Sequence, residues 1–193
     1  MARPREFETA DALEQAMRAF WAKGYQATSL RDLTAAMGLS KSSLYETFGS
    51  KHALFVAAID HYIDTMTRRV EAGLDGAASA SAAIAELFDD VIDAAVARDD
   101  RRGCFVCNSA IEVSPHDSEA AASVRAGLDR LERAFQRAVV RGQKAGDIGA
   151  EHDPGALARY LTSSLNGLHV MAKANPDRAA LEDVGRIVLS ALD

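Results

Sequence analysis

The stretch LTAAMGLSKSSLYETFGSK, residues 33–51, decides how the N-terminal part of this chain folds. In each half of the stretch, two apolar residues four positions apart are followed directly by a glycine. These residues are Leu33, Met37 and Gly38 in the first half and Leu44, Phe48 and Gly49 in the second. Residues four apart share one face of a helix, and glycine readily takes the left-handed conformation that ends a helix. The stretch therefore predicts two short helices joined by a tight turn.

Capping residues mark where these helices begin. Ser29 and Asp32 have the spacing of a capping box, and Ser40 can cap the second short helix. The same reasoning, with proline and glycine as breaks, predicts further helices along the chain. In order, the nine predicted helices cover about residues 9–23, 30–37, 41–48, 50–66, 80–98, 104–113, 118–144, 154–175 and 176–192. The segment GLDGAASAS, which starts at Gly73, is predicted to be a loop.

Composition agrees with an all-α fold. Of the 193 residues 48% are hydrophobic, and no alternating pattern of β-branched and aromatic residues is sustained. No apolar run approaches the ~20 residues that span a bilayer, and Met1 to Glu8 is charged rather than apolar. We expect a cytoplasmic protein with no membrane partner.

Charge is divided unequally along the chain. The net charge is −6, but residues 1–52 carry +1 and the remaining residues −7. The only part of the chain that is not acidic therefore contains the two short helices, which is a weak electrostatic indication of a nucleic-acid contact.

A short helix, a tight turn and a second short helix form a helix-turn-helix, whose second helix enters the major groove. With Leu44 and Phe48 buried, the outward residues of that helix are Lys41, Ser42, Ser43, Tyr45 and Glu46. Hydroxyls bind phosphates or base edges, lysine neutralises phosphates, and a helix N-terminus offers amide donors. The alternatives are a helical hairpin with serine caps and a helical interaction protein that uses the motif for packing only.

The chain resembles the TetR family of transcriptional regulators. The resemblance lies in AFWAKGYQATSLRDL, residues 19–33, and MGLSKSSLYETFGSKHAL, residues 37–54. It implies a helix-turn-helix domain over residues 1–52 and a ligand-sensing and dimerisation domain over residues 53–193. It also implies a homodimer bound to palindromic double-stranded operator DNA, acting as a repressor that an inducer releases. The DNA contacts it implies are Thr28, Ser29, Arg31, Lys41, Ser42, Ser43, Tyr45 and Lys51.

In this family the last two helices form the dimer interface. An apolar stripe along residues 154–175 fits that role, and we expect it to face a second copy, with an intramolecular core as the alternative. The stripe consists of Leu157, Leu161, Leu165 and Leu168.

The motif C-F-V-C places two cysteines one helical turn apart. A helix N-terminus and the neighbouring Arg101 and Arg102 would lower the pKa of the Cys104 thiol, and Cys107 could then resolve a sulfenic acid as a disulfide. The inducer would be electrophilic or oxidising. The alternative is that both cysteines are core residues and that the inducer is a small molecule bound without a covalent bond.

Other polar residues on apolar stretches are candidates for lining a ligand pocket: His61, Asn108, Glu112, Asn166 and His169. A thiol-disulfide enzyme is the less favoured interpretation. In such enzymes the cysteine pair follows a strand, whereas in this chain a charged helix end precedes Cys104. We expect no enzyme, no cofactor and no metal site.

Overall fold

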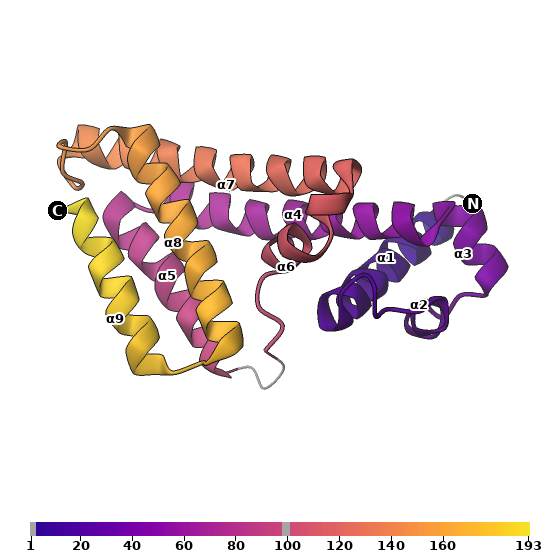
Figure 1. Cartoon of the computed structure of the whole chain (residues 1–193). Coiled ribbons are helices and arrows are strands. Elements are labelled where there is room, and N and C mark those ends of the chain that lie inside the picture. Colours follow the sequence, from indigo (N-terminus) through magenta and orange to yellow (C-terminus); the bar gives the residue numbers. More distant parts are fainter. Residues whose placement is uncertain (1–2, 98–100) are drawn as a thin grey trace. The chain divides into compact units, whose positions relative to one another are not determined.

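The computed structural model describes residues 3–97 and 101–193. Over these ranges it contains nine α-helices, two short 3-10 helices and no strand, which confirms the predicted all-α fold (Figure 1). The α-helices are α1 (Arg3–Lys23), α2 (Leu30–Met37), α3 (Lys41–Phe48), α4 (Lys51–Gly76), α5 (Ala80–Ala97), α6 (Phe105–Glu112), α7 (Ser118–Ala145), α8 (Pro154–Ala174) and α9 (Arg178–Leu189). None of the described helices combines the length and the apolar composition needed to cross a bilayer.

Several helix ends differ from the sequence prediction. Helix α1 begins at Arg3 rather than at Thr9, because the charged residues ahead of Thr9 are good helix formers. Helix α6 begins at Phe105, so Cys104 directly precedes it. The sequence predicts that the helix starting at Ala80 ends at Arg98, and Arg98 lies outside the described residues.

The loop predicted from Gly73 begins later than expected, because α4 continues to Gly76 and only residues 77–79 connect it to α5. Leu74, between the two glycines, is 1% exposed in the hydrophobic core, and Asp75 pairs with Arg137 at 3.5 Å. Packing of this turn thus outweighs the cost of about 1 kcal/mol that a glycine imposes inside a helix.

The described chain forms two compact units. The first holds the residues up to Thr65 together with Asn108–Arg125, and the second holds Met66–Cys107 and Ala126–Asp193. Helices α4, α6 and α7 each continue from one unit into the other. The domain division predicted at residues 52 and 53 concerns function and stays a prediction.

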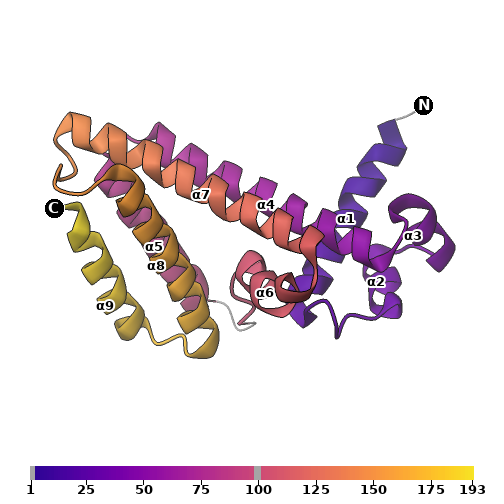
Figure 2. The same ribbon diagram turned by 45° about the horizontal axis from the view of Figure 1, so that its top comes forward.

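Aromatic contacts organise the first unit. The rings of Phe20 and Phe55 lie 5.1 Å apart edge to face, and Tyr25 lies 4.7 Å from Phe55. Trp21 and Tyr62 make a further edge contact between α1 and α4. Helix α2 contacts both α1 and α3 (Figure 2). These contacts place α2 on α1 and α3 on α2, with Tyr25 in the turn that leads to α2.

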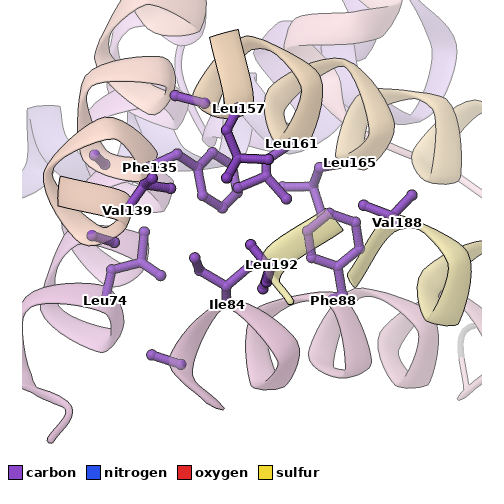
Figure 3. Packing of buried hydrophobic residues seen from close by; sticks show 14 of the residues in the cluster. Leu74, Ile84, Phe88, Phe135, Val139, Leu157, Leu161, Leu165, Val188 and Leu192 are labelled. Atoms are coloured by element: carbon purple, nitrogen blue, oxygen red, sulfur yellow. The ribbon is translucent and has the colours of Figure 1, made fainter. Parts of the chain in front are cut away.

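The core of the second unit lies where α5, α8 and α9 pack against one another, with residues of α4 and α7 (Figure 3). Ile84 and Phe88 of α5 and Phe135 of α7 are fully buried there. An Asp147 carboxylate closes one end of this core, because it accepts the N–H groups of Ala80 and Ser81 at the start of α5.

The leucine stripe of α8 belongs to this core, which corrects the prediction that it forms the dimer interface. All four leucines are at most 4% exposed within a single chain: Leu157, Leu161, Leu165 and Leu168. Helical spacing identifies the apolar face of α8, but it does not say which surface covers that face.

Candidate nucleic-acid interface and thiol site

The turn between α2 and α3 is built from side-chain caps and one left-handed glycine. Ser29 and Asp32 form the predicted capping box at the start of α2, since the Ser29 hydroxyl accepts the Asp32 N–H and the Asp32 carboxylate accepts the Ser29 N–H. Gly38 ends α2 with φ 65°, where a side chain would be strained. Ser40 caps α3 by accepting the Ser43 N–H at 3.1 Å.

Helix α3 buries one face and exposes the other. Leu44 is fully buried, whereas Lys41, Ser42, Tyr45 and Glu46 are exposed. The Lys41 ammonium group lies 5.9 Å from the centroid of the Tyr45 ring, so two predicted DNA contacts are neighbours. This face presents one cation, hydroxyls and a phenol, which suits phosphates and base edges.

Serine hydroxyls crowd the N-terminus of α3. The Ser40 Oγ lies 2.9 Å from the Oγ of both Ser42 and Ser43. In these contacts the hydroxyl protons can be shared in either direction, so the cluster can reorient to donate toward an anion at the helix N-terminus.

The residues predicted on α2 divide into two groups. Arg31 is exposed, and Ser29 is exposed but engaged in its capping box. Thr28 is fully buried, and its hydroxyl donates to the Gly24 carbonyl at 2.5 Å. The phosphate contact of Thr28 stays a prediction, although in this structure its hydroxyl bonds to the backbone of the same chain.

A salt bridge and a cation–aromatic contact stabilise the segment around the start of α2. Lys23 binds Asp32 at 2.7 Å, and this hydrogen bond, with those from Ser29, holds the pKa of Asp32 well below its usual range. Lys51, at the start of α4, lies over the Tyr25 ring. The sequence prediction missed Tyr25, although it stands inside the quoted stretch of residues 19–33.

The two cysteines lie together at the start of α6. Cys104 and Cys107 are not joined in a disulfide, and both are partly exposed. The Cys107 thiol donates to Asn166 Oδ1 at 3.1 Å, and its hydrogen bond with Cys104, helped by burial, strongly raises the pKa of Cys107. The raised pKa favours the protonated thiol, which is the form that donates to Asn166.

The five residues predicted to line a pocket are divided between the two units, and their role stays a prediction. Asn166 and His169 lie on α8 in the second unit, with Asn166 bonded to Cys107. In the first unit, His61 pairs with Glu14 at 2.9 Å, and Glu112 binds backbone N–H groups of residues 25 and 26. Asn108 lies in the first unit and is partly exposed.

Known protein families account for both parts of this arrangement. The family of bacterial regulatory proteins named tetR matches residues 12–58, which include α2, the turn and α3. The tetracyclin repressor-like C-terminal domain matches residues 80–188. The chain belongs to the TetR family. It is a DNA-binding transcriptional regulator, as the resemblance in its sequence implied.

Individual TetR-type relatives are similar over nine tenths or more of their length. The HTH-type transcriptional regulator YezE of Bacillus subtilis (strain 168) is 36% identical over 100% of both chains. The HTH-type transcriptional repressor ComR of Escherichia coli (strain K12) is 32% identical, over 98% of this chain and 90% of its own. A solved structure of the TetR family regulator CifR, a cysteine mutant complexed with 26-bp double-strand operator DNA, has a TM-score of 0.84 and 35% identity. The similarity covers 95% of this chain and 96% of that chain.

Proposed function

We propose that the chain is a dimeric repressor that binds a palindromic operator and releases it when a thiol-reactive inducer modifies Cys104. The observation that carries the proposal is the exposed face of α3, where Lys41, Ser42 and Tyr45 surround a serine-capped helix N-terminus. The repressor name of ComR and the operator complex of CifR support the same reading. The chromosome lies in the cytoplasm of a bacterium, so the proposed place of action is the cytoplasm.

The proposed DNA contacts are the residues that the family resemblance implies, most of which are exposed or partly exposed. Ser42 and Ser43 would meet base edges or phosphates, while Lys41, Tyr45 and Lys51 would meet the backbone. At the start of α2, the N-cap Ser29 and the helical Arg31 would contact phosphates, and Thr28, just before the cap, would contribute through the position of its backbone. The proposed DNA-binding domain is residues 1–52, and residues 53–193 would sense the inducer and form the dimer.

The proposed dimer face is the outer side of α8 and α9. Tyr160, Val170 and Met171 of α8 are each at least 42% exposed, and Ile187 of α9 is 64% exposed. Gly167 lies between them in sequence, and a Cβ placed on it would have open space within 4 Å. A second copy would cover this apolar face, since a palindromic site is read by a two-fold protein.

The proposed effector chemistry starts at Cys104, which precedes α6. Its thiolate would add to an activated alkene, forming a C–S bond, while the carbanion takes a proton from water. With a peroxide, the thiolate would attack one peroxide oxygen, forming the S–O bond of a sulfenic acid as the O–O bond breaks, and the other oxygen would leave as hydroxide or alkoxide. The Cys107 thiol would then attack that sulfur and expel water, leaving a disulfide. No catalytic reaction is assigned to the chain.

A gel shift with the DNA upstream of the chain's own gene tests the proposal. Wild type, Cys104→Ser and Cys107→Ser would each be titrated with and without N-ethylmaleimide, and mass spectrometry would identify the modified residue. We expect wild type to bind DNA when reduced and to release it when treated, whereas Cys104→Ser should stay bound. Release from Cys104→Ser under treatment would show instead that the cysteines are not the sensor and that the inducer binds without a covalent bond.

A further inference from the structure

Glu112, the last residue of α6, accepts two hydrogen bonds from the turn between α1 and α2. Its Oε2 accepts the backbone N–H of Tyr25 at 3.1 Å, and its Oε1 accepts the backbone N–H of Gln26 at 2.9 Å. Each carboxylate oxygen thus binds a different N–H group of the same turn. Hydrogen bonds to a charged acceptor are roughly twice as strong as neutral ones, so the pair forms a specific clamp.

The clamped turn leads directly into the helix-turn-helix. Gly24 ends α1, with its N–H bonded to the Phe20 carbonyl, and Ser29 caps α2 five residues later. The Thr28 hydroxyl closes the turn by donating to the Gly24 carbonyl. The position of the Tyr25 and Gln26 amides therefore sets where α2 begins.

Gly24 leaves room for the carboxylate. Its φ is +80°, and a Cβ built on it would lie 2.5 Å from Glu112 Oε2, closer than real Cβ atoms approach. The Glu112 side chain thus packs on the bare backbone of Gly24. Any larger residue there would push the carboxylate away from its two partners.

The opposite end of α6 holds the thiols. Cys107, in the first turn of α6, donates to Asn166 of α8 within the second unit. Cys107 and Glu112 are five residues apart, or roughly 7.5 Å along a helix at 1.5 Å per residue. The two residues are joined by one continuous stretch of helical backbone, so a shift imposed at the cysteine end can reach the carboxylate.

We propose that Glu112 is a positioning residue that transmits the state of the cysteine end of α6 to the helix-turn-helix. The inference rests on the proposed function and names the contact by which a modified thiol would alter DNA binding. A displacement of α6 by about 1 Å would lengthen both bonds from about 3 to about 4 Å, which breaks them. The freed turn would then let α2, and α3 after it, leave the arrangement that fits DNA.

The test compares Glu112→Gln and Glu112→Ala with wild type. Glutamine keeps the shape but offers one acceptor oxygen, and its amide NH₂ would face the second N–H group, whereas alanine removes both acceptors. Glu86→Gln, at an exposed position of α5, is the matched control for loss of one charge. Each protein is measured reduced and after treatment with N-ethylmaleimide, by DNA titration and by deuterium uptake of peptides that contain residues 24–29.

Three results are expected. Deuterium uptake at residues 24–29 rises in Glu112→Ala, and reduced Glu112→Ala binds DNA about tenfold more weakly. For each protein, the Kd for DNA after treatment is divided by the Kd of the reduced protein. This ratio is expected to be smaller than in wild type by roughly threefold or more in Glu112→Ala, intermediate in Glu112→Gln and unchanged in Glu86→Gln. A residue that only stabilises the fold would lower the Tm and leave that ratio unchanged.

The contrary outcomes separate the two proposals. An unchanged ratio in Glu112→Ala, or unchanged uptake at residues 24–29, overturns the role of Glu112 while wild type still binds and releases DNA. A wild-type protein that does not bind its upstream DNA, or does not release it on treatment, overturns the proposed function itself.

Discussion

The ammonium group of Lys51 lies over the ring of Tyr25, with 4.5 Å between Nζ and the ring centroid. Lys51 is the first residue of α4 and directly follows the turn that ends α3. A cation over an aromatic face is attracted by about 0.5–1 kcal/mol at an exposed site. The lysine is therefore held in place beside the helix-turn-helix while it keeps its charge.

If Lys51 meets a DNA phosphate, Lys51→Ala should reduce the slope of log affinity against log salt by about one. One fewer counterion would be released when the complex forms. Fluorescence anisotropy over a salt series measures the slope, and Lys144→Ala, at an exposed lysine of α7, serves as the control. An unchanged slope in Lys51→Ala would remove Lys51 from the interface.

Ser40→Ala should weaken DNA binding and also destabilise α3. The Ser40 hydroxyl accepts the Ser43 N–H, and loss of such a cap costs about 1 kcal/mol of unfolding free energy. Ser42→Ala removes a neighbouring hydroxyl without removing the cap, so it should weaken DNA binding at nearly unchanged stability. Chemical denaturation and DNA titration on both variants check this, and equal stability losses would show that Ser40 does not act as the cap.

Ile187→Arg should produce monomers that bind operator DNA weakly. The side chain is 64% exposed in one chain, so the substitution fits the isolated fold, but it would bury a charge without a partner if a second copy covers this face. Ile111→Arg, at an isoleucine that is 71% exposed in the first unit, is the control. Light scattering that finds Ile187→Arg still dimeric would place the interface elsewhere.

Leu165→Ala should destabilise each chain by about 2–5 kcal/mol, because it opens a cavity in the core beside Phe88. The unfolding free energy is measured by urea titration at one fixed protein concentration, since dimerisation makes stability depend on concentration. Ile111→Ala, at an isoleucine of the first unit that is 71% exposed and lies outside the proposed dimer face, should cost far less in the same titration. Similar losses in the two variants would contradict the assignment of Leu165 to the core.

Asp117 should make stability depend on pH in acid. The Asp117 carboxylate accepts a hydrogen bond from the Ala120 N–H and pairs with His52 Nε2 at 2.5 Å. These contacts hold the pKa of Asp117 below its usual range, although burial acts to raise it. A lowered folded-state pKa stabilises the protein above the unfolded value of about 3.9, and this contribution is lost as pH falls through the folded pKa. Wild type should therefore exceed Asp117→Asn in Tm at pH 7, and this advantage should begin to shrink as the pH falls below about 5. Parallel Tm curves down to pH 3 would contradict this.

Much of the fold follows from signals that act within a few residues. The capping box of Ser29 and Asp32, the cap of Ser40 and the left-handed Gly38 lie where their spacing predicts, and they delimit α2 and α3. Such signals are readable because caps and glycine conformations depend on the local backbone alone. The helix-turn-helix was thereby predictable from residues 29–49.

The tertiary structure decided which partners the apolar and charged side chains take. Spacing identified the leucine face of α8, but only packing showed that Phe135 and Ile84 of the same chain cover it. Glu112 lies 86 and 87 residues from the amides it binds, and Cys107 lies 59 residues from Asn166. Helical periodicity reports the direction of a side chain around its own axis. It carries no information on which distant backbone or helix that side chain meets, because chain folding brings those groups together.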